Sequence, residues 1–300
     1  MSGTISGVFL PPITPFLDGA VDLPSYERIL ERALARGVRG IVALGTTGEA
    51  SALEEDEQAM IVERTLEVVG GRVPVYVGIG GNATAKVVRA VQRLERFEFQ
   101  GILSVCPYYV RPSQDGLYEH FARIAAATSR EVLIYNIPYR TGINLTNDTL
   151  LRLAEIANIV GVKDSCGDLV QSVDLLRRRR PGFAVMTGED AMVYTHLAQG
   201  GDGGILAAAH LATEVFVQVH ERMAGNDHHG ARALWSGIEP LIPLLFREAN
   251  PMPLKYCLWR QGVIRSPECR LPLTRLSPAL AGELDRLLGR LGITPGSGGR

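Results

Sequence analysis

The sequence predicts an α/β fold, a (β/α)8 TIM barrel with a helical extension at its C-terminal end. Eight short apolar runs rich in β-branched residues recur along the chain, with helix-like segments between them. Several runs are apolar throughout, which is typical of strands buried on both faces of a parallel sheet. No Pro-, Gly- or Ser-rich linker interrupts the repeats in 300 residues, which favours one barrel over two domains. A doubly wound sheet is the alternative fold.

The elements follow in a regular order. The predicted strands cover residues 7–10, 40–44, 73–79, 101–105, 132–136, 159–163, 183–187 and 203–206. Helices are predicted over 22–36, with Ser25 near the start, over 53–69, which begins with four acidic residues, and over 84–97 and 146–157, which open on Thr84 and Thr146 as candidate caps. After the eighth strand only helices are predicted, over 213–224, 229–247, 253–261 and 277–291. We therefore expect a barrel over 1–224, a helical extension packed on it over 225–293, and a frayed tail over 294–300.

Composition excludes several classes of function. Lys plus Arg number 31 and Asp plus Glu 32, and a net charge of -1 provides no positive field for nucleic acid or an anionic membrane. No apolar run approaches the roughly 20 residues that span a bilayer. Residues 1–7 lack the order of a signal peptide, so we expect a cytoplasmic protein. The four cysteines form no C-x-x-C and the six histidines no H-E-x-x-H, so no metal site is expected.

Polar side chains gather at the predicted C-terminal ends of the strands, which is where TIM barrels place their active sites. Lys163 ends the sixth strand, so its amine is expected in the mouth of the barrel, partly withdrawn from water. Desolvation lowers the pKa of an amine, which favours attack on a ketone and imine formation. The alternative is an ion pair with Asp164 or another carboxylate at the rim. Only three of the 31 cations are lysines (Lys86, Lys163 and Lys255), and since arginine forms ion pairs but no Schiff base, this rarity favours chemistry.

Neighbouring strand ends supply groups that imine chemistry needs. A proton relay could use the hydroxyls of Tyr135, Thr46 and Tyr109. The alternative for Tyr135 is a half-buried aromatic residue of the strand, and the alternative for Tyr108 and Tyr109 is a loop or subunit contact. The loop 45–49, Gly-Thr-Thr-Gly-Glu, offers backbone N–H groups and hydroxyls to a carboxylate or phosphate, or is simply a capped turn. Arg140 is placed to clamp a second carboxylate, or is an exposed turn residue.

Three motifs together resemble the signatures of one family. Gly-Thr-Thr-Gly-Glu at 45–49, Tyr-Asn-Ile-Pro at 135–138, and Gly-Val-Lys-Asp at 161–164 with Gly167 and Asp168 resemble those of the dihydrodipicolinate synthase / N-acetylneuraminate lyase family. The resemblance runs from residue 7 to about residue 291. Pro-Tyr-Tyr at 107–109 followed by Arg-Pro-Ser-Gln, the double threonine, Arg140, and Asn-Pro-Met-Pro at 250–253 with Lys255 resemble the synthases more than the sialic acid lyases.

The resemblance implies a class I aldolase-type condensation of pyruvate with L-aspartate 4-semialdehyde to 4-hydroxy-tetrahydrodipicolinate, in lysine and diaminopimelate biosynthesis. No metal or dissociable cofactor is implied, and a homotetramer built as a dimer of dimers is expected. By the resemblance, Lys163 is the Schiff-base lysine, and Tyr135 is the proton donor and acceptor. Thr46 and Tyr109 complete the proton relay; Tyr109 reaches a neighbouring subunit, and Tyr108 lies at that interface. The residues around pyruvate are Thr47, Ile205 and Gly188, and Arg140 binds the second carboxylate.

Two departures from the synthase pattern affect substrate and regulation. Position 139 is usually small, so Tyr139 is expected to crowd the pocket of the second substrate. This supports an alternative 2-oxo acid, such as 4-hydroxy-2-oxoglutarate, a 2-keto-3-deoxy sugar acid or a pyrroline-4-hydroxy-2-carboxylate. A barrel that binds a 2-oxo acid without catalysis is a third hypothesis. Regulated members receive lysine on an acidic residue, and Lys86 at that position, with Glu55 and Gln58 at nearby histidine positions, predicts weak or absent feedback.

Overall fold

The structure is a computed structural model that describes residues 5–292, and within that range eight parallel strands close into a barrel in the order β1-β10-β9-β8-β7-β6-β5-β4. The TIM barrel is confirmed and the doubly wound alternative is wrong, because the sheet has no open edge. The eight predicted strands are the barrel strands, with ends that differ by up to two residues: β1 Gly7–Leu10, β4 Gly40–Ala43, β5 Val75–Gly78, β6 Gly101–Val105, β7 Glu131–Asn136, β8 Ile159–Asp164, β9 Ala184–Thr187 and β10 Gly203–Ile205.

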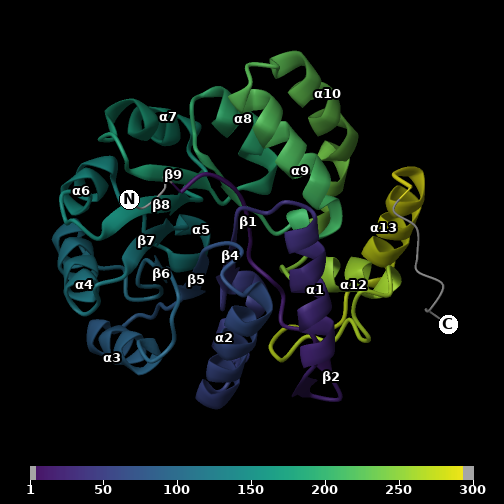
Figure 1. The fold of residues 1–300 in the computed structure, drawn as a ribbon, viewed down its shortest axis with the longest axis horizontal. Helices are drawn as coiled ribbons and strands as arrows, with labels where there is room; N and C mark the ends of the chain where they lie inside the picture. Colours follow the sequence, from purple (N-terminus) through teal and green to yellow (C-terminus); the bar gives the residue numbers. More distant parts are fainter. Residues whose placement is uncertain (1–4, 293–300) are drawn as a thin grey trace.

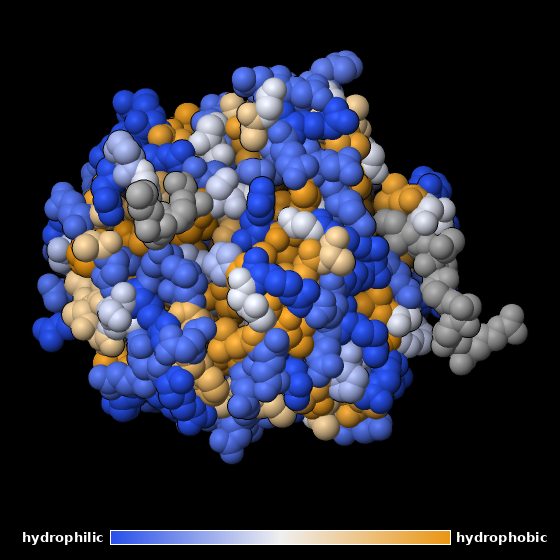
Figure 2. Space-filling model, viewed as in Figure 1, coloured by the Kyte–Doolittle hydropathy of each residue, from blue (hydrophilic) through white to orange (hydrophobic). Residues whose placement is uncertain are grey.

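Helices surround the strands (Figure 1). The ring consists of α1 Leu23–Ala35, α2 Glu55–Val69, α3 Thr84–Leu94, α4 Gln114–Ala126, α6 Asn147–Leu153, α7 Leu169–Arg178, α8 Val193–Ala198 and α9 Ala209–Ala224. One set of strand side chains faces these helices, and the alternate set, which includes Val42, Tyr76, Leu133 and Met186, fills the inside of the barrel. The filled interior leaves the site at the ends of the strands. On the face shown in Figure 2, hydrophilic residues cover most of the surface.

Three helix starts differ in detail from the prediction. Asp22, not Ser25, caps α1, and its carboxylate accepts a hydrogen bond from the Ser25 N–H at 3.2 Å. Thr84 lies inside α3, where its hydroxyl contacts His120 Nδ1 at 2.9 Å. Thr146 occupies the cap position of α6, but its hydroxyl bonds to side chains of neighbouring residues instead of the helix backbone. Tertiary partners have therefore replaced the local capping bonds in α3 and α6.

The extension contains α10 His228–Ile238, α11 Ile242–Leu245, α12 Met252–Arg260 and α13 Pro278–Arg290. The single predicted helix over 229–247 is wrong, because Pro240 and Pro243 interrupt it and a short 3-10 turn, η4 Glu239–Leu241, intervenes. Figure 1 shows α10, α12 and α13 to one side of the barrel ring. α9 begins earlier than predicted and has a non-helical residue at Ala212. The proposed division at 224/225 stays a prediction, and the expected tail over 294–300 lies outside the described residues.

Two further findings concern the chain as a whole. A short hairpin, β2 Phe16–Leu17 with β3 Ala20–Val21, precedes α1 and was not predicted, because two-residue strands leave no periodic pattern. In the part of the chain that the structure describes, no helix is long and apolar enough to cross a membrane.

Candidate active site

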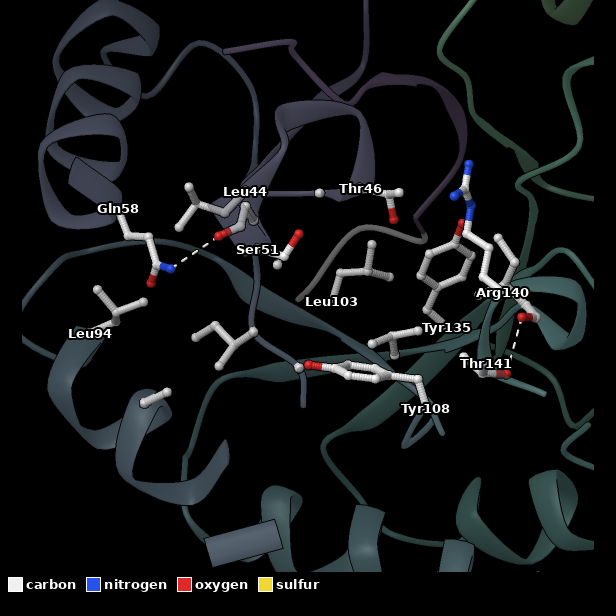
Figure 3. Close-up of a pocket in the computed structure, with 18 of the residues that line it drawn as sticks. Leu44, Thr46, Ser51, Gln58, Leu94, Leu103, Tyr108, Tyr135, Arg140 and Thr141 are labelled. Atoms are coloured by element: carbon white, nitrogen blue, oxygen red, sulfur yellow. Dashed lines mark hydrogen bonds between the residues drawn. The ribbon is translucent and has the colours of Figure 1, made fainter. Parts of the chain in front are cut away.

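The predicted site residues meet at the C-terminal ends of the strands. Seven of them line one small pocket together with Asp190 and Asn250: Thr46, Thr47, Tyr135, Arg140, Lys163, Gly188 and Ile205. A larger cavity of about 450 Å³ adjoins it and shares Thr46, Tyr135 and Arg140. Figure 3 shows these three residues at one end of the larger cavity, with Gln58 and Leu94 at the other end and the Tyr108 ring between them. The chemistry-bearing groups are therefore concentrated at one end of a much longer cavity.

Lys163 lies near the end of β8, beside its neighbour in the register, Tyr135 of β7. Its side chain is buried, with the residue 7% exposed, and Nζ lies 4.3 Å from the centroid of the Tyr135 ring. Burial lowers the pKa of Lys163 to about 8, although the nearby carboxylates of Asp190 and Glu189 act in the opposite direction. The expected shift of this amine toward its neutral form is present.

The alternative ion pair between Lys163 and Asp164 is not formed. The Asp164 carboxylate instead accepts hydrogen bonds from the Ser172 hydroxyl at 2.5 Å and the Cys166 N–H at 3.1 Å. Within residues 5–292, no carboxylate lies within ion-pair distance of Lys163. The amine is buried without a direct counter-ion.

Gly188, directly after β9, leaves room for the stem of Lys163. A Cβ at this position would lie 2.5 Å from Lys163 Cε and would also overlap the Ser165 hydroxyl. The Gly188 N–H donates to the Asp164 carbonyl at 2.8 Å, so the backbone cannot retreat without losing a hydrogen bond. A side chain at 188 would therefore displace the lysine. Ile205, at the end of β10, is buried on the same pocket.

The Tyr135 phenol is buried, and burial raises its pKa well above the usual range. The Arg140 guanidinium and the hydroxyls of Ser165 and Thr46 favour the phenolate but do not reverse that direction. Tyr135 therefore carries its proton at neutral pH and can donate it. Its hydroxyl meets polar groups in the pocket, so the simple alternative of an apolar strand aromatic does not describe it.

The loop after β4 forms a 3-10 turn, η1 Thr46–Gly48, which is hydrogen-bonded to the segment after β1 and to the extension. The Asn250 side-chain amide donates to Thr47 Oγ1 at 3.0 Å, and the Thr14 hydroxyl donates to the Gly48 carbonyl at 2.7 Å. The N–H groups of Gly48 and Glu49 are used inside the loop, on the carbonyls of Gly45 and Thr46. The predicted anion-binding surface is thus narrower than the whole loop and is limited to Thr46 and Thr47.

Arg140 belongs to a short helix, α5 Pro138–Thr141, and lines both pockets. Its guanidinium lies 5.4 Å from the centroid of the Tyr139 ring. Tyr139 is 65% exposed at the rim and does not line the larger cavity. Tyr139 does line the small pocket with Lys163 and Arg140, so the expectation that it crowds the pocket of the second substrate stays a prediction.

Tyr109 does not join the other site residues within one chain. It is 88% exposed, adopts a left-handed φ of 73°, and lines neither pocket. Its neighbour Tyr108 lines the larger cavity and is partly exposed. A relay through Tyr109 therefore requires another copy of the chain.

Sequence reasoning missed Asp190 and Asn250. Asp190 is buried, accepts a hydrogen bond from the Ala208 N–H at 2.6 Å, and has a pKa raised to about 7 by burial. Its signal was available, because Gly188-Glu189-Asp190 directly follows the seventh strand at the site edge of the barrel. Asn250 comes from the extension, and no strand-end pattern could have placed it. Among residues 5–292, no group of three His, Cys, Asp or Glu side chains is arranged to hold a metal ion.

Comparisons with known proteins show the family of the chain. The model of the Dihydrodipicolinate synthetase family matches residues 4–290. The chain is 50% identical over 284 residues to 4-hydroxy-tetrahydrodipicolinate synthase 2 of Clostridium acetobutylicum, covering 95% of this chain and 99% of the relative. A solved structure of the chloride-inhibited dihydrodipicolinate synthase of Acinetobacter baumannii, complexed with pyruvate, is 37% identical at a TM-score of 0.94, covering 97% and 100% of the two chains. The synthase of Cyanidioschyzon merolae, solved with lysine bound, is 32% identical at a TM-score of 0.92, covering 96% and 98%. The chain belongs to the dihydrodipicolinate synthetase family.

Proposed function

We propose that this protein is a Schiff-base-forming lyase that condenses pyruvate with L-aspartate 4-semialdehyde to 4-hydroxy-tetrahydrodipicolinate, in lysine and diaminopimelate biosynthesis. The observation that carries the proposal is Lys163, a buried amine without a direct counter-ion at the end of β8, with a pKa of about 8. The imine on this lysine supplies the electron sink, so no external cofactor is required.

The lowered pKa makes the first step feasible at neutral pH. At pH 7.5, about a quarter of an amine with a pKa near 8 is neutral, against about 0.1% of an ordinary lysine. The neutral Nζ attacks the ketone carbon of pyruvate to give a carbinolamine. Loss of water, with a proton delivered to the leaving hydroxyl, gives the imine.

Proton transfers accompany and follow imine formation, and Tyr135 is placed to carry them. The Tyr135 hydroxyl delivers the proton for dehydration, and the resulting phenolate accepts one from the pyruvate methyl group to give an enamine. The Thr46 hydroxyl continues the relay, and Tyr109 from a second copy completes it. The enamine carbon then forms the new bond to the aldehyde carbon, whose oxygen takes a proton from the relay and becomes the product hydroxyl. The amino group of the semialdehyde attacks the imine carbon, loses a proton to the relay and displaces the Lys163 amine, which closes the ring of the product.

Binding groups flank this centre. Thr46 and Thr47 offer their hydroxyls and the start of the η1 turn to the carboxylate of pyruvate, and Gly188 and Ile205 line the same pocket. Arg140 presents a planar guanidinium that suits the carboxylate of the semialdehyde. The A. baumannii relative was solved with pyruvate, which supports the choice of the first substrate.

The direct test is intact mass and peptide mapping after incubation with pyruvate and borohydride, followed by an assay of aspartate semialdehyde turnover. We expect one reduced adduct on Lys163 and formation of the cyclic product. An adduct on Lys163 without turnover of the semialdehyde would change the second substrate. No adduct at any pyruvate concentration would overturn the imine mechanism.

The alternative 2-oxo acids are not favoured. The synthase name of the C. acetobutylicum relative supports the semialdehyde, and Tyr139 lies at the rim, where it leaves the larger cavity open. A non-catalytic binding barrel would retain pyruvate affinity in a Lys163→Ala variant. We expect that variant to lose most pyruvate binding, because the covalent bond is absent.

We also propose a homotetramer, built as a dimer of dimers, in the cytoplasm. Two separate exposed apolar surfaces support two interfaces: Tyr108, Tyr109 and Val110 after β6, and Leu169, Val170 and Val173 on α7. A second copy covers the first surface and receives Tyr109. Analytical ultracentrifugation tests the assembly: Val170→Asp should yield active dimers, and a monomeric wild-type protein would contradict the proposal. Cell fractionation tests the location.

A further inference from the structure

Lys255, on α12, is a second buried lysine that the proposed reaction does not use. Its side chain is 0% exposed, and Nζ lies 2.5 Å from Oε1 of Glu49. The ammonium also donates to the Glu268 carbonyl at 2.7 Å and lies 4.2 Å from the centroid of the Phe16 ring. The second carboxylate oxygen of Glu49 accepts from the Arg270 N–H at 3.0 Å. Both charges of this pair are enclosed by protein, and Lys255 Nζ is the charge that faces Oε1 of Glu49.

Glu49 is the last residue of the loop that carries Thr46 and Thr47. It adopts a left-handed conformation, with φ 52° and ψ 35°, between the turns η1 Thr46–Gly48 and η2 Ala50–Ala52. A non-glycine residue keeps this conformation only where its surroundings impose it. The Glu49 N–H donates to the Thr46 carbonyl at 3.0 Å, so a change at Glu49 is transmitted to Thr46.

The extension holds this loop at two points. Lys255 pairs with Glu49 at one end of the loop, and Asn250 bonds to the Thr47 hydroxyl in its middle. Both contacts come from the segment that begins α12. The barrel alone provides neither of them, and the loop itself consists of two single turns without an extended helix or strand.

Barrel topology separates this loop from the reacting lysine. In the closed order, β4 and β8 are four strands apart, on opposite sides of the barrel. Thr46 follows β4, and Lys163 lies on β8 beside Tyr135 of β7. A displacement of the loop would move Thr46 away from Tyr135 while Lys163 keeps its own strand and the space left by Gly188.

A buried ion pair suits a positioning role better than a purely stabilising one. Removing two charges from water costs free energy that their attraction barely recovers, and apolar residues of similar size often stabilise a core more. An ion pair that joins two segments, however, specifies how those segments are placed relative to each other. Here the two segments are the loop and the extension.

We propose that Lys255 and Glu49 are positioning residues for the Thr46 hydroxyl, through which the extension sets the proton relay of the barrel. The inference rests on the proposed function, because it assigns the pair to the proton transfers after imine formation. The proposal predicts that proton transfer is impaired while imine formation is not, whereas a general loss of structure would impair both steps.

The test compares imine formation with proton transfer in a Lys255→Met variant of the full chain. Borohydride trapping at saturating pyruvate measures the imine on Lys163, and deuterium exchange into the pyruvate methyl group, followed by NMR, measures proton transfer. We expect trapping per folded protein to stay within about twofold, and exchange and kcat to fall by roughly 10- to 100-fold, because a small misplacement of a reacting group has effects of this size. Equal changes in trapping and exchange would overturn the proposal.

Three further variants keep the test decisive. Ile124→Ala, which leaves a cavity under α4, a helix that packs against α3 and α6, is the control for lost stability and should leave the ratio of exchange to trapping at the wild-type value. Glu49→Gln keeps the shape and an acceptor, so a smaller fall in exchange is expected. Lys255→Met combined with Glu49→Gln removes both charges of the pair. A wild-type exchange rate in that variant would mean that the two residues only neutralise each other, and it would overturn the positioning role. If wild-type protein forms no adduct, the proposed function fails, and if it does while exchange is unchanged in all variants, only this inference fails.

Discussion

Lys163 and Lys255 are the two buried lysines of the chain, and they differ in whether a carboxylate lies next to the amine. Burial lowers the pKa of both amines. Lys255 has a carboxylate 2.5 Å away and a carbonyl at 2.7 Å, whereas Lys163 has no ion-pair partner within residues 5–292 and faces a pocket. Desolvation alone therefore does not make a reactive lysine. The absence of a direct counter-ion separates the reacting amine from the structural one.

The position of each lysine in the fold explains this difference. Lys163 lies on a barrel strand, where the backbone is fixed by ladder hydrogen bonds on both sides and the amine needs no partner to be placed. Lys255 lies on α12 and reaches across to a loop that lacks regular structure, so its ammonium is used as a contact. One lysine is positioned by the fold, and the other positions part of it.

The largest effect is expected from replacing each lysine by methionine and comparing activity. Lys163→Met should reduce turnover and borohydride trapping to background, since no other lysine among residues 5–292 lines the pocket. The variant should leave stability unchanged or higher, because an unpaired buried amine is removed. Steady-state kinetics and thermal unfolding measure both. Residual trapping on another lysine would show that the comparison assigns the chemistry to the wrong residue.

The same replacement at Lys255 should also lower stability, in addition to the loss of proton transfer proposed above. Lys255→Met leaves the Glu49 carboxylate buried without its counter-ion, which costs roughly 3–5 kcal/mol of unfolding free energy. Urea unfolding of wild type, Lys255→Met and Lys163→Met, with reversibility checked, measures the contrast. Similar unfolding free energies for the two variants would remove the distinction between a free and a paired lysine.

Gly188→Ala should displace the free lysine and leave the paired one in place. The added methyl group would lie 2.5 Å from Lys163 Cε, so the amine must leave its present position. We expect kcat/KM to fall on the order of 100-fold, the size of effect produced by a shift of about 1 Å in a reacting group. A matched control is Gly237→Ala, where a Cβ meets nothing within 4 Å and activity should be unchanged. Wild-type kinetics for Gly188→Ala would mean that the lysine has other room.

Much of this arrangement could be predicted from the sequence, because it follows from strand periodicity. The eight apolar runs located the barrel strands, and the rule that barrel sites lie at the C-terminal strand ends brought Lys163, Tyr135 and Thr46 together. Arg140 also lies where the strand-end reasoning placed it. These residues needed no information beyond their place in each repeat.

Other features depend on contacts that local patterns do not encode. Glu49 appeared only as the last residue of a glycine-threonine loop, since its partners Lys255 and Arg270 lie about 200 residues further along the chain. The place of the Tyr139 ring also depends on such contacts, because pattern fixes position but not rotamer: it lines the small pocket and lies beside the Arg140 guanidinium. The hydroxyls of Thr84 and Thr146 make no capping bond for a similar reason, since they contact side chains of α4 and α6 instead, although Thr146 does occupy the cap position.

A smaller effect is expected on the pH dependence of Lys163. The Asp190 carboxylate favours the ammonium form, so Asp190→Asn should lower the pKa of Lys163 below about 8. Imine formation requires the neutral amine, and its rate rises with pH through that pKa. The half-maximal rate of trapping, measured between about pH 6 and pH 10, should therefore move to lower pH in the variant. A shift to higher pH would show that Asp190 does not act on Lys163 through its charge.

The smallest effect concerns the third lysine, Lys86, which is exposed on α3, whereas the other two lysines are buried. Its ammonium occupies the position where regulated members of the family hold an acidic residue for feedback lysine, and like charge repels the ligand's own ammonium. We therefore expect wild-type activity to be unaffected by L-lysine at sub-millimolar concentration, measured in the semialdehyde assay. Lys86→Glu reverses the sign of the charge and should increase sensitivity by a modest factor, because an exposed pair contributes only about 0–1 kcal/mol. Strong inhibition of the wild type would mean that neighbouring groups, such as Glu55, already receive the ammonium and that an exposed lysine is no barrier to it.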